Sequence, residues 1–199
     1  MFLILNLLFL IVYYTIPVLQ IIIVLLGYSL VLLMVVGYLA YTWVMVYSAR
    51  MGAPYVPSSN RRLQDILSHA HIGPSDVFLD LGCGDGRVVF AASRKYGCKG
   101  RGIDISKPLI WVARLFAKIY GLSSKCEFKA EDIRKTHLAD ATVIYIFLFP
   151  QLVEQMQDRL MSLASGTRII SHGFTLNFLE KKLTHVRQDK PFSTYYYTL

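Results

Sequence analysis

The chain has 199 residues, 54% of them hydrophobic, and a formal net charge of +8. Its three cysteines show no C-x-x-C spacing and its five histidines lack metal-site spacing, so the sequence supports neither a disulfide framework nor a metal centre. The charge is confined to one part of the chain, because residues 1–49 contain no Lys, Arg, Asp, Glu or His.

Residues 1–49 form an apolar segment that predicts a membrane anchor. About 20 apolar residues cross the roughly 30 Å of hydrocarbon in a bilayer, whereas a helix of this length would reach about 73 Å. We therefore expect two transmembrane helices, near Phe2–Leu19 and Val24–Val46, since Pro17 and Gln20 interrupt the first half. One long tilted helix preceded by an interfacial segment is the alternative, because no clearly polar loop separates the halves.

The flanks of the anchor predict its orientation. Arg50, Arg61 and Arg62 follow it closely, and an excess of positive charge marks the cytoplasmic side. The apolar run is far longer than the roughly 7–15 residues of a signal-peptide core, and it lacks the Arg- and Ser-rich composition of a transit peptide. We expect a protein of the cell membrane, with the lipid bilayer as a partner and the C-terminal part in the cytoplasm.

Residues 50–76 connect the anchor to the remainder, 77–199, which has the length of one ordinary domain. Pro54 and Pro57 predict an extended segment. Ser58, Ser59 and Asn60 then cap a predicted helix over 61–71.

Strand-like and helix-like segments alternate from residue 77 onward, which predicts an α/β domain with a mostly parallel sheet. The last two strands are joined through Asp189-Lys190-Pro191 and predict a hairpin that closes the sheet with an antiparallel strand. The expected strands are 77–81, 100–104, 126–130, 142–148, 167–172, 184–188 and 193–199, and the expected helices are 86–96, 107–120 and 151–164.

The most informative motif is a glycine-rich turn after the first strand, with the pattern Asp80-x-Gly82-x-Gly84-x-Gly86. Glycine lets backbone N–H groups approach a ligand that side chains would block. A dinucleotide fingerprint would need its third glycine at position 87, which is Arg87, and no P-loop motif occurs. Asp104 ends the second strand, where an acid is placed to accept hydrogen bonds from ribose hydroxyls. The pattern therefore indicates a nucleoside pocket.

These residues resemble motif I and the ribose-binding acid of the class I methyltransferases that use S-adenosyl-L-methionine (SAM). The resemblance implies a Rossmann-like sheet and SAM as the cofactor. It implies that Asp132 lies near the adenine amino group, with Glu131 as the competing choice. Alternatively, Asp80 only stabilises the turn and Asp104 only caps a helix. The implied cofactor-binding residues are Asp80, Gly82, Cys83, Gly84, Gly86, Asp104, Ile105 and Asp132.

A closer resemblance appears when the apolar N-terminus is combined with Pro54–Ser58, Phe149-Pro150 and the segment Gly166–Phe174. Together they resemble the membrane-anchored protein-lysine methyltransferases that modify the ATP synthase c-subunit and the adenine nucleotide translocase, and their prokaryotic relatives. The resemblance implies N-methylation of lysine in a membrane protein, with Tyr55 lining the active site. Alternatively, Tyr55 anchors the domain to lipid. The longer apolar N-terminus and shorter C-terminus depart from the eukaryotic enzymes.

The segment after the fourth strand bears on the substrate. Phe149-Pro150 stands where amide- and base-directed amino methyltransferases keep a polar motif, which disfavours those substrates, and a membrane tether limits access to nucleic acid. Two alternatives stay open: a lipid or quinone methyltransferase, and a SAM-binding assembly factor without turnover. His172 fits best as a hydrogen-bonded structural residue.

Overall fold

The computed structural model describes residues 2–50 and 60–199. The predicted extended segment around Pro54 and Pro57, and Tyr55 with it, lies outside these residues. The chain divides into two compact units, Met1–Val46 and Tyr47–Leu199.

The N-terminal segment is one continuous helix, α1 (Phe2–Arg50), so the prediction of two helices is wrong for the described structure. Pro17 lies inside this helix, where its missing N–H removes one hydrogen bond, and no polar or glycine-rich loop follows to turn the chain back. Within α1, Val12–Trp43 is long and apolar enough to cross a membrane.

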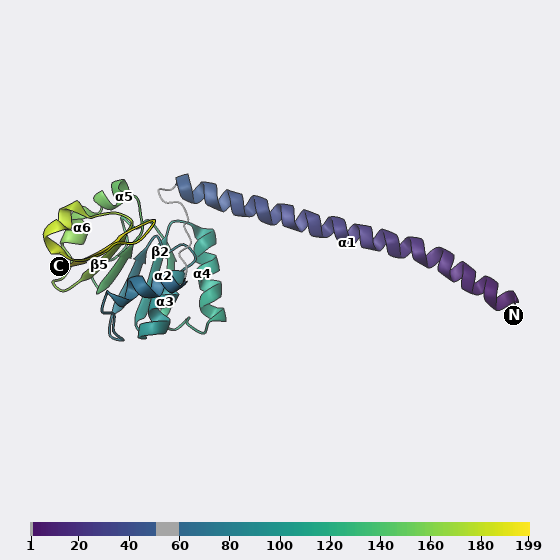
Figure 1. Cartoon of the computed structure of the whole chain (residues 1–199), viewed down its shortest axis with the longest axis horizontal. Helices are drawn as coiled ribbons and strands as arrows, with labels where there is room; N and C mark the ends of the chain where they lie inside the picture. Colours follow the sequence, from purple (N-terminus) through teal and green to yellow (C-terminus); the bar gives the residue numbers. More distant parts are fainter. Residues whose placement is uncertain (1, 51–59) are drawn as a thin grey trace. The chain divides into compact units, whose positions relative to one another are not determined.

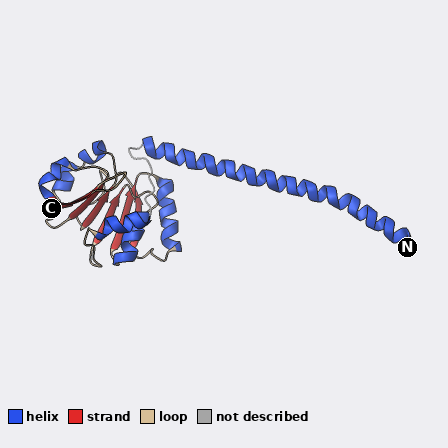
Figure 2. Ribbon diagram, in the orientation of Figure 1, coloured by secondary structure: helices blue, strands red, loops and turns tan. Residues whose placement is uncertain are grey.

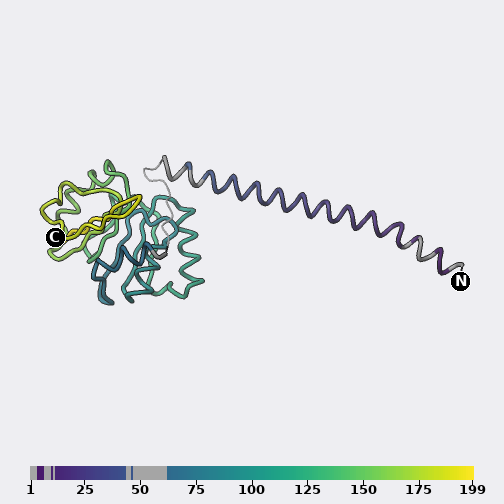
Figure 3. Tube along the Cα trace, viewed as in Figure 1, coloured from purple at the N-terminus to yellow at the C-terminus, as the bar shows by residue number. Residues whose placement is uncertain are grey.

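The second unit is built on a seven-stranded sheet in the order β3-β2-β1-β4-β5-β7-β6. The first five strands are parallel and β7 runs antiparallel to both β5 and β6, as predicted. Figure 2 shows the sheet in red, and Figure 3 shows the C-terminal hairpin in yellow at its edge. The strands are β1 (Val77–Leu81), β2 (Lys99–Asp104), β3 (Cys126–Ala130), β4 (Val143–Ile146), β5 (Arg168–His172), β6 (Leu183–Arg187) and β7 (Thr194–Thr198).

Helices cover both faces of the sheet (Figure 1). On one face lie α2 (Asn60–Ser68), α3 (Arg87–Tyr96) and α4 (Lys107–Ile119). The other face carries α5 (Pro150–Glu154), α6 (Gln157–Met161) and the 3-10 helix η1 (Asn177–Lys182). The helix expected over 151–164 is thus split into two short helices, the one expected over 61–71 ends three residues early, and η1 was not expected.

The central strands alternate their apolar side chains between two cores, because successive residues of a strand point to opposite faces. Phe78 and Tyr145 pack with α2 and α3, whereas Leu79 and Ile144 pack with Val153 of α5 and other residues of the opposite layer. Burial on both faces is typical of parallel strands and explains their continuous apolar runs. Because β1, β2, β4 and β5 are parallel, their carboxyl ends meet at one edge of the sheet.

The amino ends of the strands are tied together by Asp76, which lies just before β1. Its carboxylate accepts hydrogen bonds from Thr142 Oγ1 (2.6 Å), Arg168 Nη2 (2.5 Å) and the Gly73 N–H (2.7 Å). Burial alone would raise the pKa of Asp76, but these hydrogen bonds and the Arg168 charge outweigh it and hold the pKa below its usual value. Asp76 therefore joins three segments that are distant in the sequence.

We expect Asp76→Ala to lower the free energy of unfolding by about 1.5–3 kcal/mol, the usual worth of hydrogen bonds to a charged group. A depressed carboxyl pKa stabilises the fold above the unfolded pKa near 3.8, so the deficit should shrink as the pH falls through the folded pKa. Urea denaturation of the full chain in detergent, followed by near-UV circular dichroism, measures it. Asp140→Ala is the control, because Asp140 pairs with Arg101 at a more exposed site and should cost less than about 1 kcal/mol. An equal loss in both variants would refute the role of Asp76.

Candidate functional site

The glycine-rich turn after β1 is held against the end of β2. The N–H groups of Gly82 and Cys83 both donate to Ile103 O, at 2.8 and 3.0 Å. The φ angles of Gly82, Gly84 and Gly86 are +85°, +54° and +82°, values that residues with a Cβ rarely adopt. The sequence pattern therefore reflects a backbone conformation that three glycines make accessible.

Two of the local glycines are also required by packing. A Cβ on Gly86 would lie 2.6 Å from the Phe128 ring, and a Cβ on Gly102 would lie 2.6 Å from the same ring and 2.7 Å from Cys83 Sγ. Phe128 of β3 thus fills the space beneath the turn. Sequence reasoning missed this residue, whose only signal is its apolar position in a strand that carries charged residues on either side.

Asp104 lies beside the turn at the carboxyl end of β2. Its Oδ2 accepts the Gly84 N–H at 2.9 Å, and its Oδ1 accepts the Ser106 N–H at 2.8 Å. Burial raises the pKa of Asp104, and the two backbone hydrogen bonds oppose that rise. Each oxygen keeps a further lone pair, so the oriented carboxylate can still accept hydrogen bonds from a ligand.

Asp80 lies beneath the turn and is 2% exposed. Among the described residues, no group forms a hydrogen bond with its buried Oδ2, and the buried Tyr145 hydroxyl, on the register partner of Asp80 in β4, has none either. Burial, followed by the charges of Asp104 and Asp85, raises the pKa of Asp80 well above its usual value. A buried acid next to a second acid favours a cationic ligand, because a positive charge would relieve the repulsion.

The remaining residues predicted to bind the cofactor are Cys83, Ile105 and Asp132, with Glu131 as the alternative to Asp132. Cys83 is buried and burial raises its thiol pKa well above the usual value, so it serves packing rather than nucleophilic chemistry. Ile105 is 40% exposed beside Asp104. Asp132 follows β3, where its carboxylate is bound by the Arg134 guanidinium at 2.6–3.0 Å. The Glu131 N–H donates to Asp104 O at 3.1 Å and joins the ends of β2 and β3.

An aromatic cluster follows β4 and β5 at the same edge of the sheet. We use this name for two groups of rings at this edge: Phe147, His172 and Phe192, with centroids 4.7–5.9 Å apart, and Phe149 and Phe174, with centroids 6.3 Å apart. Leu148, between Phe147 and Phe149 in the sequence, would lie 2.8 Å from a Cβ on Gly82, so the segment after β4 reaches the glycine turn. Phe149 is 41% exposed.

His172 is a structural member of this cluster, as the sequence favoured. It is 1% exposed and its Nδ1 forms a 2.8 Å hydrogen bond with Thr194 Oγ1. Burial, aided by the charge of Arg62, lowers its pKa to about 4. The ring is therefore neutral at pH 7 and a weak base.

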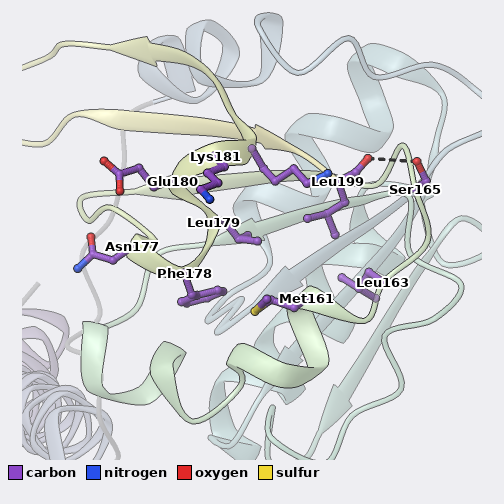
Figure 4. Close-up of a pocket in the computed structure, with 10 residues that line it drawn as sticks. Met161, Leu163, Ser165, Asn177, Phe178, Leu179, Glu180, Lys181 and Leu199 are labelled. Carbon is purple, nitrogen blue, oxygen red and sulfur yellow. Dashed lines mark hydrogen bonds between the residues drawn. The ribbon is translucent and has the colours of Figure 1, made fainter.

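A separate cavity of about 620 Å³ lies away from this edge (Figure 4). It is lined by η1, the end of α6 and the C-terminal Leu199, whose carbonyl oxygen accepts a 3.4 Å hydrogen bond from Ser165 Oγ. Ser165 precedes β5, so the cavity lies toward the amino ends of the parallel strands. Ligands of open α/β sheets bind outside the carboxyl ends, so the glycine turn is the candidate site. The described residues contain no group of acids, histidines and cysteines suited to a metal ion.

The chain is similar to one protein family and to several proteins of known type. The ANTKMT methyltransferase domain model matches residues 80–182, more than half of the chain. The protein-lysine N-methyltransferase of Saccharolobus islandicus is 29% identical over 125 residues, which cover 62% of this chain and 78% of that protein. The adenine nucleotide translocase lysine N-methyltransferase of Mus musculus is 33% identical over 128 residues, which cover 64% of this chain and 56% of that protein. The chain thus spans just over half the length of the mouse relative.

A solved structure gives the same result for the fold. The RNA methyltransferase from Salinibacter ruber, in complex with S-adenosyl-L-homocysteine, superposes with a TM-score of 0.67 at 30% identity, covering 72% of this chain and 93% of that one. The class I methyltransferase family predicted from the glycine turn and Asp104 is confirmed, and so is the closer resemblance to the lysine methyltransferases. The chain belongs to the ANTKMT methyltransferase domain family.

Proposed function

We propose that this chain is a membrane-anchored enzyme that uses SAM to N-methylate lysine in a membrane protein. The observation that carries the proposal is the glycine turn bound to Asp104, with aromatic side chains after β4 and β5 at the same edge of the sheet. When bound, SAM supplies an electrophilic methyl group, and the protein has to hold it and present a neutral nucleophile.

The residues of the pocket fit this cofactor. The unpartnered, buried Asp80 carboxylate suits the cationic amine of the methionine part, and the oriented Asp104 carboxylate suits the ribose hydroxyls. The backbone N–H groups at the start of α3 suit the methionine carboxylate. We assign the cofactor to Gly82, Gly84, Gly86, Asp80 and Asp104, with Cys83 supporting the turn, and with Ile105 and Asp132 near the adenine.

The aromatic cluster suits the acceptor, because it follows β4 and β5 at the edge that bears the cofactor turn. A free lysine amine has a pKa near 10.4 and is almost fully protonated at pH 7. An apolar wall disfavours the charged form and lowers that pKa. Aromatic faces also attract the methylammonium product without an acidic partner, each contact being worth about 0.5–2 kcal/mol. Tyr55 is proposed to line the same side, from the sequence alone.

The relatives support the choice of lysine. The archaeal and mouse relatives are lysine N-methyltransferases by name, and the mouse enzyme is named for a translocase. The Salinibacter ruber neighbour is named for RNA, so RNA is included among the test substrates below.

The proposed anchor is the apolar part of α1, Val12–Trp43. Arg50 ends α1, and Arg61 and Arg62 lie in the first turn of α2. An excess of positive charge marks the cytoplasmic side, which supports our proposal that the catalytic unit lies on the cytoplasmic side of the cell membrane. An enzyme and a substrate held in one bilayer meet at a raised effective concentration, which favours a membrane-protein substrate.

With methyl-labelled SAM and membranes of the source organism, we expect the full chain to label a membrane protein band at lysine. Asp104→Ala should weaken SAM binding by about 1.5–3 kcal/mol, or roughly 10- to 150-fold, through loss of a charge-assisted contact. Calorimetry on the full chain in detergent measures the affinity, and gel autoradiography measures the label.

The matched control is Glu127→Ala, which removes an exposed acid from the neighbouring strand and should leave both readouts unchanged. Label confined to extractable lipid or quinone, or to added RNA, would reject lysine as the acceptor. Tight SAM binding without any labelled product would identify an assembly factor instead. An unchanged affinity of Asp104→Ala would reject the site itself.

Asp80→Asn should stabilise the cofactor-free chain at pH 7 by about 1–3 kcal/mol, since it removes a carboxyl group whose ionisation burial disfavours and whose Oδ2 has no partner among the described residues. A raised carboxyl pKa stabilises the fold below the unfolded pKa near 3.8, and this contribution is lost as the pH rises through the folded pKa. The gain should therefore shrink on acidification, while SAM affinity falls at pH 7. Urea titrations at several pH values and calorimetry test this. A destabilised variant with normal SAM affinity would show that Asp80 serves the turn alone.

Phe149→Leu should lower kcat/KM for the labelled membrane protein by about 3- to 30-fold, the loss of one cation–π contact to the positive charge that develops on the amine during methyl transfer. Phe149→Tyr keeps the ring and should stay close to wild type. Because Phe149 is half exposed and lies on the acceptor side, SAM affinity should be unchanged in both variants. Equal rates for the leucine and tyrosine variants would exclude a cation–π role.

A further inference from the structure

Helix α4 has two apolar sides. Ile110, Ala113 and Ala117 are buried against the sheet and its neighbouring helices. Trp111, Leu115 and Ile119 recur every four residues and are 66%, 40% and 64% exposed. At about 100° of rotation per residue, the centre of this second set lies opposite the buried set. We call Trp111, Leu115 and Ile119 the outer stripe.

The outer stripe is unusual for a helix that packs on a sheet. The outward side of such a helix normally carries polar and charged residues, and a contiguous exposed apolar patch indicates an interaction surface. No residue of α4 is acidic, and Lys107 and Lys118 lie together on one flank of the stripe. Arg114 shares this flank but is bound to Phe128 O at 2.7 and 3.0 Å. An apolar stripe with a tryptophan and flanking lysines is the pattern of helices that lie in a membrane interface.

We propose that the outer stripe of α4 docks on the bilayer that holds α1, with Lys107 and Lys118 contacting anionic headgroups. This inference rests on the membrane anchoring proposed above and adds a second lipid contact made by the catalytic unit itself. Each lysine near an anionic surface contributes about 1 kcal/mol to binding. The chain as a whole, with a net charge of +8, is also attracted to an anionic surface.

The covalent tether makes so small a contact sufficient. Nine residues separate the end of α1 at Arg50 from the start of α2 at Asn60, and even a fully extended chain of this length spans only roughly 30 Å. The unit therefore stays near the membrane surface, where docking is an intramolecular event at high effective concentration. An interaction too weak to recruit a free protein can then orient a tethered one.

Docking through α4 would also orient the candidate site. Lys107 begins α4 three residues after Asp104, and the exposed Ile105 lies between them. The end of β2 is thereby directed toward the headgroups. The acceptor side after β4 and β5 lies at the same edge of the sheet as the end of β2, which suits a lysine just outside the bilayer, on a membrane protein. Among the basic residues close in sequence at 94, 95, 99 and 101, Arg101 pairs with Asp140 and Arg94 lies over the Tyr120 ring.

The chain offers its own probes, because Trp43 and Trp111 are its two tryptophans. The full-length Trp43→Phe variant retains only Trp111, and Trp111→Phe retains only Trp43 in α1. Each is reconstituted in vesicles of phosphatidylcholine and phosphatidylglycerol, with or without bromine near the glycerol end of the acyl chains. We expect bromine to quench Trp111 emission and the emission maximum to shift to the blue relative to detergent.

Charge variants test the headgroup contact. Lys107→Gln/Lys118→Gln in the Trp43→Phe background should shift the docking equilibrium by about 30-fold, from about 1 kcal/mol for each lysine. The control Lys181→Gln/Lys182→Gln removes the same charge from η1 and should leave the quenching of Trp111 unchanged. Vesicles of phosphatidylcholine alone should reproduce the effect of the α4 variant.

The outcomes separate the two proposals. Quenching of Trp43 without quenching of Trp111 overturns the docking of α4 and leaves the anchor intact. Absence of quenching at both tryptophans overturns the anchor as well. Quenching of Trp111 that is equally sensitive to both lysine pairs would refute the specific headgroup contact.

Discussion

The hydrogen bond from the Gly84 N–H to Asp104 Oδ2, at 2.9 Å, is the contact on which the site depends. It joins the turn after β1 to the end of β2, and the two N–H groups that donate to Ile103 O hold the same turn in place. Any other residue at position 84 would have to adopt a backbone φ of +54°, which is unfavourable for most residues with a side chain. The position of the acid and the shape of the turn therefore define each other.

This coupling explains why the cofactor side was predictable from sequence. Asp80, the glycines and Asp104 are fixed by local backbone requirements, and their order along the chain places them at one edge of a parallel sheet. The buried strands were equally clear, because they are apolar on both faces. The continuity of α1 was not, since whether Pro17 breaks a helix depends on the hydrogen bonds and solvent around it. The second role of Gly86 and Gly102, as space for Phe128, requires the tertiary structure.

The outer stripe was missed for a related reason. Trp111, Leu115 and Ile119 have the spacing of a core-facing stripe, and a sequence cannot say which of two apolar faces packs. Packing on the sheet selects the face with Ala113 and Ala117, since small side chains let a helix approach closely, and the larger residues remain outside. The aromatic cluster is similar, because Phe149 and Phe174 come from segments that only the sheet order brings together.

The pocket holds two acids in a desolvated place where neither is neutralised by a basic side chain of the described residues, an arrangement that opposes folding. Asp80 is buried without a partner for Oδ2, and the adjacent Asp104 raises its pKa further. A ligand that brings a positive charge to this place binds the folded chain only, and so stabilises it by mass action. The same electrostatic repulsion that weakens the empty fold thus becomes affinity for a cation such as the amine of SAM.

The acceptor side has the opposite character, since the aromatic cluster has no carboxylate among its members and favours an amine that has lost its proton. One edge of the sheet therefore combines an acidic site for the amine of SAM with an aromatic wall, without a carboxylate, for the acceptor amine, which is the asymmetry that methyl transfer to a lysine requires.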